Sequence, residues 1–241
     1  MSRIPRTPDE IFEEFSMDYK SKFGDDLLSI ILYGSGAKGD YIYKKSDLNF
    51  LITLTNEGMK NIRKCLPLIK KYSKRNVTTP LFLTEEYMKN SLDSYPVEFF
   101  NIKSSYQLVY GEDVLAKLNI EKEFLRLQSE RELKGKLLHL REAYLSTAHE
   151  KKLMRQLISD SITSFTSIFT VLLHFNNEAI ASQKRDIFRN TAQVFKLDEK
   201  LFDQLLEVRK NTLKLSKEEY HDILEKYIAE ISKLTSIVDK L

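Results

Sequence analysis

Glycine and proline, the residues that most often interrupt regular structure, are almost confined to the first half of this chain. All five prolines and six of the seven glycines lie at or before Gly111, and only Gly135 follows. Beyond Gly111 the sequence carries long apolar repeats at helical spacing. This distribution predicts two architectures: a turn-rich domain over residues 1–118 and an all-helical domain over residues 119–241.

Composition limits the class of protein and its partners. The 241 residues are 42% hydrophobic and 30% charged, which is typical of a globular protein with a real core. The 38 basic and 35 acidic residues give a net charge of +3, which is too small an excess to make nucleic acid the default partner.

The same composition indicates where the protein resides. Cys65 is the single cysteine and cannot form an intramolecular disulfide, and the first ten residues lack the apolar run of a signal peptide. The most apolar stretch, Ile162–Phe175, is shorter than a membrane span and contains serine and threonine. We therefore expect a cytoplasmic protein with no membrane partner.

Short apolar runs bounded by turn residues predict the strands of the first domain: Leu27–Tyr33, Asp47–Thr55, Val77–Leu83 and Pro96–Ile102. The expected helices are one capped by a Thr7–Glu10 capping box and ending near Gly24, a basic one from about Glu57 to Arg75, and a short one capped by Thr84. This order predicts an α+β fold with a small mixed β-sheet covered by helices.

The second domain reads as a bundle of helices with short connections. The clearest helix begins at Ser216, whose capping-box partner is Glu219, and continues to Val238. The other expected helices are Glu121–Leu145, Lys152–Phe175, Ser182–Phe195 and Leu201–Leu213.

The segment with the most chemical information is ILYGSGAKGDYIYKKSDLNFLITL, residues 31–54. A tight Gly34–Ser35 turn at the start of a helix offers backbone N–H groups and a hydroxyl to phosphate oxygens. Gly36 would let the backbone approach a ligand, and Lys38 could meet a phosphate as a point charge. These four residues are the predicted nucleotide-binding set.

Two polar residues open the following strand. Residues two apart on a strand point to the same side, so Asp47 and Asn49 should face one pocket and could hold Mg²⁺. A third carboxylate usually completes such a site. Glu98 on the later strand is the candidate, and Asn101 or Asp93 are alternative polar groups.

The Gly-Ser turn followed by an acidic residue at the next strand resembles the signature of nucleotidyltransferases of the DNA polymerase β type. Two further segments, LTEEYMKNSLDSYPVEFFNIKSSYQLVYGED and RLQSERELKGKLLHLREAYL, extend the chain's similarity nearly end to end to a group of uncharacterised bacterial predicted nucleotidyltransferases.

This resemblance implies an activity and a set of roles. The chain would transfer a nucleoside monophosphate from a nucleoside triphosphate to an unknown hydroxyl or amine acceptor. Asp47 and Glu98 would act in catalysis, and Asp47, Asn49 and Glu98 would hold Mg²⁺. In antibiotic-modifying relatives the helical domain helps to bind the acceptor, so the bundle from Glu121 onward would set specificity.

Position 49 departs from the family pattern, which is Asp-x-Asp, because it is asparagine. An amide oxygen can contact a cation but brings no negative charge, so the site should hold one divalent ion more readily than two. The alternative hypothesis is therefore a degenerate, non-catalytic module that binds a nucleotide or a protein.

Other functional interpretations have weaker support. The basic helix could contact RNA or DNA phosphates, but a solvated helix face is the favoured interpretation. The four histidines show no metal-ligand spacing. Arg141 and His149 are only distantly similar to the arginine–histidine pair of helical ribonuclease toxins, and we do not favour that role.

Overall fold

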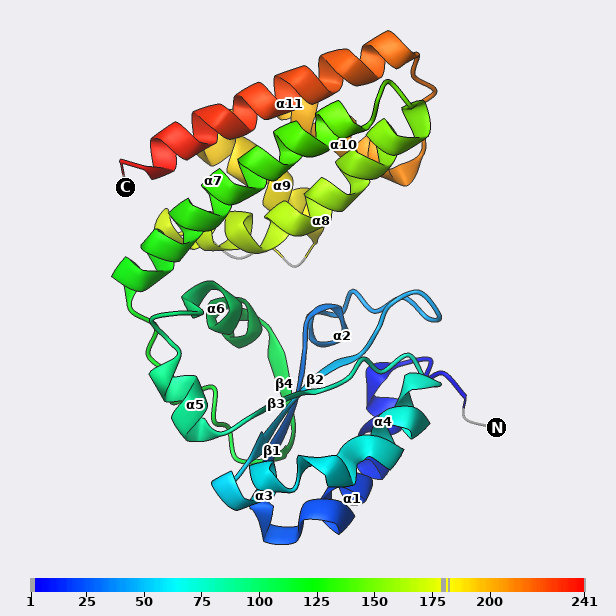
Figure 1. Ribbon diagram of the computed structural model, residues 1–241, viewed down its shortest axis with the longest axis vertical. Helices are drawn as coiled ribbons and strands as arrows, with labels where there is room; N and C mark the ends of the chain where they lie inside the picture. Colours follow the sequence, from blue (N-terminus) through cyan, green and yellow to red (C-terminus); the bar gives the residue numbers. More distant parts are fainter. Residues whose placement is uncertain (1–2, 179–180, 182, 241) are drawn as a thin grey trace. The chain divides into compact units, whose positions relative to one another are not determined.

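The computed structural model describes residues 3–178, 181 and 183–240. The chain forms two compact units, Met1–Glu121 and Lys122–Leu241, which are considered separately below (Figure 1). The boundary expected after Leu118 lies in the same connecting segment as this division.

A four-stranded mixed sheet forms the centre of the first unit. Its strands are β1 (Leu27–Tyr33), β2 (Asn49–Leu54), β3 (Leu81–Leu83) and β4 (Tyr106–Gly111), in the order β3-β2-β1-β4. The central strand β1 is antiparallel to both β2 and β4, whereas β3 is parallel to β2. The α+β class and the mixed sheet expected from the sequence are confirmed.

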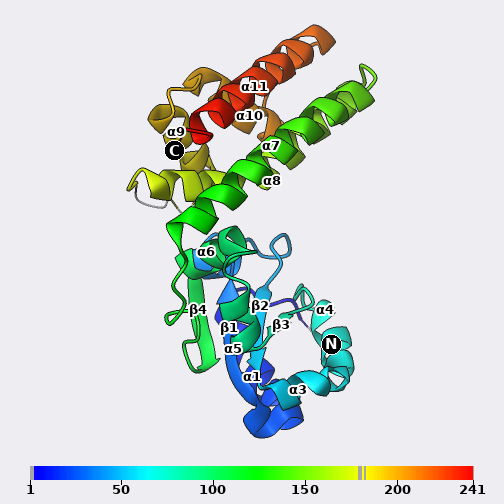
Figure 2. The same cartoon turned by 60° about the vertical axis from the view of Figure 1, so that its left-hand side comes forward.

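Helices cover both faces of this sheet (Figure 2). On one face, α1 (Phe12–Phe23) and α4 (Leu66–Ser73) pack against β1 and β2, where the Phe15 ring stacks on Phe50 at a centroid distance of 4.2 Å. The opposite face carries Ile31 and Leu51, and is covered by α5 (Glu85–Asn90) and α6 (Pro96–Ser104).

The strand expected at Pro96–Ile102 is wrong, because this segment is helix α6. Pro96 occupies the first helical turn, where its missing N–H costs nothing, and Phe99 and Ile102 are buried at helical spacing. Aromatic and branched residues favoured the strand interpretation, but a short apolar run does not distinguish the two structures. The edge strand β4, which follows α6, was not predicted.

Three local expectations in the first unit also need correction. The basic segment is not one helix but α3 (Asn56–Lys60), a 3-10 helix (Ile62–Cys65) and α4. The Thr7–Glu10 capping box does not form: the Thr7 side chain makes no capping hydrogen bond, and the Glu10 carboxylate accepts from the Arg6 N–H at 2.9 Å. The third strand is shorter than expected: Val77 forms only an isolated bridge with Leu48, and β3 begins at Leu81.

The second unit consists of helices α7 (Lys122–Ser146), α8 (Lys151–Phe175), α9 (Lys184–Val194), α10 (Glu199–Lys210) and α11 (Lys217–Val238). No strand occurs in the part of this unit that the structure describes, as the sequence predicted. Ser216 forms the predicted capping box with Glu219. The expected start of the third helix, Ser182, lies outside the described residues.

Helix α8 is the core helix of this unit. Phe165, Phe169 and their apolar neighbours on α8 pack against α9, α10 and α11. Among the described residues, α8 is the helix long and apolar enough to cross a membrane, with a mean hydropathy of 1.3 over its most apolar window. Since 56% of that window is buried inside the protein, the length and composition of α8 are explained by core packing.

Candidate nucleotide site

The expected phosphate-binding turn follows β1 directly. Gly34 has φ = +75°, a backbone conformation that favours glycine, and α2 (Ser35–Lys38) forms a single helical turn. The N–H groups of Ala37 and Lys38 donate to the Gly34 carbonyl, each at 3.1 Å. The chain is thus folded into the tight turn at a helix start that the sequence predicted.

Gly36 has a structural role in this turn. A Cβ atom at this position would lie 3.2 Å from Leu48 Cδ2 and 3.3 Å from both Cδ atoms of Leu32. Glycine therefore lets the turn pack closely on β1 and on the residue that precedes β2. The close approach that the sequence assigned to a ligand is made here by the protein's own core.

Lys38 closes the turn and is half-buried. Burial lowers the pKa of its amine, and the nearby Asp40 carboxylate opposes this effect only in part. A partly dehydrated cation is stabilised when an anion approaches it. Its position and electrostatics suit a ligand carrying phosphate.

Asp47 and Asn49 differ in their surroundings. Asp47 is exposed and lies just before β2, not within it, whereas Asn49 is half-buried and is the first residue of β2. In the strand register Asn49 is opposite Tyr33, the residue before Gly34. A Cβ atom on Gly34 would lie 3.4 Å from Asn49 Nδ2. The turn and the start of β2 therefore form one continuous surface.

Thr78 is a site residue that sequence analysis missed. Its hydroxyl donates to Asn49 Oδ1 at 3.0 Å, and its N–H donates to the Leu48 carbonyl at 3.1 Å. Both bonds depend on the parallel alignment of the segment before β3 with the segment before β2. The sequence offered only the short TTP run as a signal, and nothing local in that run indicates its partner.

Glu98 is not placed as predicted. It lies in the first turn of α6 and is exposed, so the assumption that a neighbouring strand presents it is wrong. Helix α6 does cover the face of the sheet that carries Leu51, and Asn49 shares that face because it is two residues away. Among the alternatives, the Asn101 amide donates to the Val97 carbonyl and Asp93 is exposed.

The donor set fits one Mg²⁺ ion better than two. The oxygens available there are one exposed carboxylate, on Asp47, and two neutral oxygens in contact with each other, Asn49 Oδ1 and Thr78 Oγ1. Within the described residues, no group of three or more histidine, cysteine or acidic side chains could hold a metal. Mg²⁺ commonly uses one or two carboxylates together with substrate phosphates, so a single ion arriving with a triphosphate is compatible with these residues.

Two other groups of residues considered from the sequence, the basic segment and the histidines, make contacts within the protein. In the basic segment, Lys71 pairs with Glu14 and Asp18, and Arg75 pairs with Glu14, so part of its charge serves the fold. In the second unit, His149 Nδ1 and His221 Nε2 lie 3.0 Å apart, a contact that the sequence spacing did not indicate.

Comparison with known proteins bears on the fold and the family of the chain. No family model matches the chain. A Methanocaldococcus jannaschii protein named "Putative protein adenylyltransferase" is 31% identical over 119 residues, which cover 46% of this chain and 78% of that protein. The structure also resembles spectinomycin adenyltransferase AAD(9) from Enterococcus faecialis, solved with ATP and spectinomycin.

The match to AAD(9) has a TM-score of 0.55 and covers 91% of this chain and 99% of that one. Its 12% identity supports a shared fold only. The sequence similarity to the Methanocaldococcus jannaschii protein indicates homology in addition to a shared fold. The chain belongs to the nucleotidyltransferase-fold family.

Proposed function

We propose that this protein binds a nucleoside triphosphate at the Gly34–Lys38 turn and transfers its nucleoside monophosphate to a hydroxyl or amine acceptor. The observation that carries the proposal is the continuity between this turn and the start of β2, where Asp47 and Asn49 lie two residues apart. Similarity to an archaeal protein named as an adenylyltransferase supports adenylyl transfer in particular.

Each residue of the site has a defined part in this proposal. Backbone N–H groups at the start of α2 and the Lys38 amine would hold the phosphates. Asp47 and Asn49 Oδ1 would hold one Mg²⁺, which would offset phosphate charge when bound. The acceptor oxygen or nitrogen would form a bond to the α-phosphorus while the bond from phosphorus to the bridging oxygen breaks. Pyrophosphate would leave, and the acceptor's proton would pass to solvent. Glu98 has no assigned role, because its predicted strand does not exist.

A second candidate function is nucleotide binding without transfer. The observation that favours it is the neutral side chain of Asn49, which leaves Asp47 as the one anionic side chain over residues 47–54. Transfer through a two-ion centre would need more negative charge than this. A binding module would retain the turn and the affinity for nucleotide.

One experiment separates the two functions. The protein is incubated with each α-labelled nucleoside triphosphate, Mg²⁺ or Mn²⁺ and cell extract, and covalent label is followed on protein, RNA and small molecules. Transfer predicts label that is lost in Asp47→Ala and retained in Asp25→Ala, an exposed acidic control. Binding alone predicts retention of nucleotide in equilibrium dialysis with no covalent label. Absence of both results would refute both functions.

A further inference from the structure

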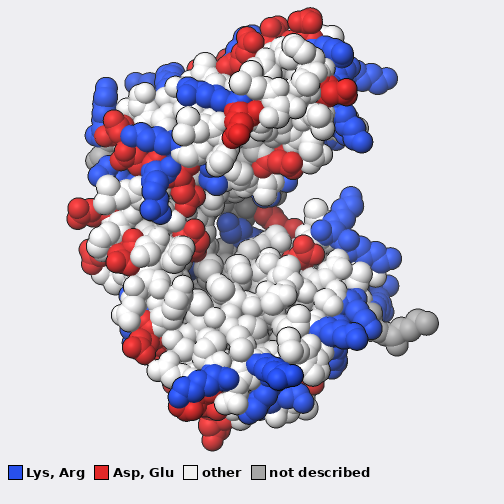
Figure 3. Space-filling view, in the orientation of Figure 1, with Lys and Arg blue, Asp and Glu red and all other residues white. Residues whose placement is uncertain are grey.

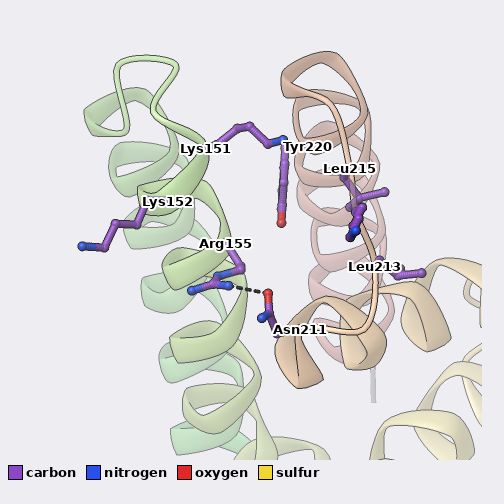
Figure 4. Close-up of a pocket in the computed structure, with 8 residues that line it drawn as sticks. Lys151, Lys152, Arg155, Asn211, Leu213, Leu215 and Tyr220 are labelled. Atoms are coloured by element: carbon purple, nitrogen blue, oxygen red, sulfur yellow. Dashed lines mark hydrogen bonds between the residues drawn. The ribbon is translucent and has the colours of Figure 1, made fainter.

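A pocket of about 480 Å³ lies within the second unit, where the start of α8 faces the end of α10 and the start of α11 (Figure 4). The residues that line it are Lys151, Lys152, Arg155, Asn211, Leu213, Lys214, Leu215 and Tyr220. All of them belong to the second unit, so the pocket shares no residue with the Gly34–Lys38 turn.

The pocket is strongly cationic. Four of its lining residues are Lys151, Lys152, Arg155 and Lys214, and no acidic residue lines it. Over the described chain, none of these four cations forms an ion pair within 4.0 Å, although other lysines of the unit do, such as Lys210 with Glu207 at 3.0 Å. Basic residues therefore dominate the lining, although the Glu219 carboxylate interacts electrostatically with Lys151 from outside it.

Two of the acidic residues near the pocket in sequence, Glu219 and Glu207, make hydrogen bonds of their own, whereas Glu150 directly precedes Lys151 and is exposed. The Glu219 carboxylate accepts from the Ser216 N–H at 2.6 Å in the capping box of α11. Glu207 accepts from the Thr212 hydroxyl at 2.7 Å as well as from Lys210. The first turn of α8 contains no acidic residue, although its N-cap residue is Glu150. Cations in the first turn of a helix are unfavourable because of the helix dipole. A bound anion would relieve this repulsion.

Two of the cations are held in place by neutral groups. The Lys151 amine lies 5.9 Å from the centre of the Tyr220 ring, and the Arg155 guanidinium donates to Asn211 Oδ1. Figure 4 shows both side chains reaching toward the opposite wall, whereas Lys152 points away from it. Lys151 and Arg155 therefore both extend from α8 across the pocket, and the exposed Lys214 adds a third cation from the loop between α10 and α11.

We propose that this pocket binds a soluble ligand that carries two or more linked phosphate groups. Several cations around one concavity match several adjacent anionic groups, and the volume is typical of small-molecule sites. A nucleic-acid strand would instead require an extended basic stripe. Figure 3 shows acidic and basic side chains interspersed over the visible face of this unit.

The test uses inorganic triphosphate as the probe, measured by calorimetry in EDTA. All proteins carry Lys38→Ala, so that the turn in the first unit contributes little binding. The protein with Lys151 and Lys214 intact should bind triphosphate more tightly than orthophosphate. Adding Lys151→Ala and Lys214→Ala should weaken triphosphate binding by about tenfold or more, because each removes a charged donor. Lys226→Ala, which removes an exposed lysine elsewhere on α11, should leave it unchanged.

The melting temperature of each variant is measured first, and unchanged values show that a loss of binding is local. Equal triphosphate affinity with and without Lys151 and Lys214 would overturn the proposal, as would no binding at millimolar probe. Tighter binding of a mixed-sequence RNA oligonucleotide than of triphosphate would also overturn it and identify a nucleic-acid surface. None of these results depends on nucleotidyl transfer by the first unit.

Discussion

Replacing Asn49 with aspartate tests whether the start of β2 is a metal–nucleotide site. The change keeps the side-chain size and keeps an acceptor for the Thr78 hydroxyl, which lies 3.0 Å from Asn49 Oδ1. It adds a negative charge two residues from Asp47. Such residues are about 7 Å apart, and two unit charges at that distance repel by about 0.6 kcal/mol in water or about 2.4 kcal/mol at an effective dielectric constant of about 20.

The expected cost lies toward the lower value, because Asp47 is exposed. A loss of about 1 kcal/mol in the free energy of unfolding lowers the melting temperature of a chain of this size by about 2–4 °C. A metal that binds only the native state restores about 2.7 kcal/mol at 100 times its dissociation constant. Saturating Mg²⁺ with a triphosphate analogue should therefore raise the melting temperature of Asn49→Asp by roughly 5–10 °C.

Thermal denaturation with EDTA, Mg²⁺ and a non-hydrolysable triphosphate measures each of these shifts. Adding Asp47→Ala to the variant should remove the response to the metal. Asn90→Asp, which places the same charge at an exposed position on α5, should show no gain over the wild type. If Asn49→Asp responds to metal and nucleotide no more strongly than the wild type does, the start of β2 does not bind the metal and the reasoning fails.

Three further predictions concern single residues. Asp47→Ala should abolish covalent labelling while changing the free energy of unfolding by less than about 0.5 kcal/mol, since Asp47 is exposed; a variant that still labels would exclude Asp47 from the mechanism. Gly111→Ala should lower the free energy of unfolding, measured by urea denaturation, by more than about 2 kcal/mol. Gly111 has φ = +77°, and a Cβ atom there would lie 2.0 Å from the Leu28 carbonyl oxygen. A variant with wild-type stability would contradict the pairing of β4 with β1. Burial raises the pKa of Asp18. Hydrogen bonds from Lys71 at 2.6 Å and from Tyr72 at 2.7 Å lower the pKa by more than burial raises it, so the pKa lies below its ordinary value. The stabilisation by the Asp18 carboxylate is therefore present above the ordinary pKa and is lost as the pH falls through the folded-state pKa. Asp18→Asn should be less stable than the wild type at about pH 7 and should match it in strong acid. A constant difference in stability across an acid titration would refute the role of ionisation.

The parts of the fold that were predictable are those specified by neighbouring residues. Strand β1 was predicted at Leu27–Tyr33 because seven consecutive residues form a compact apolar run that ends at a glycine. Helix α11 was predicted because Ser216 and Glu219 form a capping box that involves only the first turn. In both cases the information lies within a few residues of the element itself.

The parts that were missed depend on contacts between distant residues. Helix α6 was read as a strand because Phe99 and Ile102 satisfy either pattern, and only packing against Leu51 and Leu83 decides between them. Strand β4 exists through its pairing with β1, and its exposed edge position leaves Tyr106–Gly111 without a strong alternating pattern. Such contacts cannot be read from a single sequence.

The charge at position 49, and not the hydrogen bond from Thr78, separates nucleotidyl transfer from nucleotide binding. A carboxylate at position 49 would accept the Thr78 hydroxyl as readily as the amide oxygen does, so the bond itself does not prevent metal binding. The backbone of the turn, the register of Asn49 with Tyr33 and the parallel approach of Thr78 do not depend on the charge at position 49. The count of negative charges at the start of β2, rather than any difference in fold, is therefore the property that decides between the two candidate functions. Because one substitution changes that count without requiring the backbone to move, the choice is open to direct measurement in this chain.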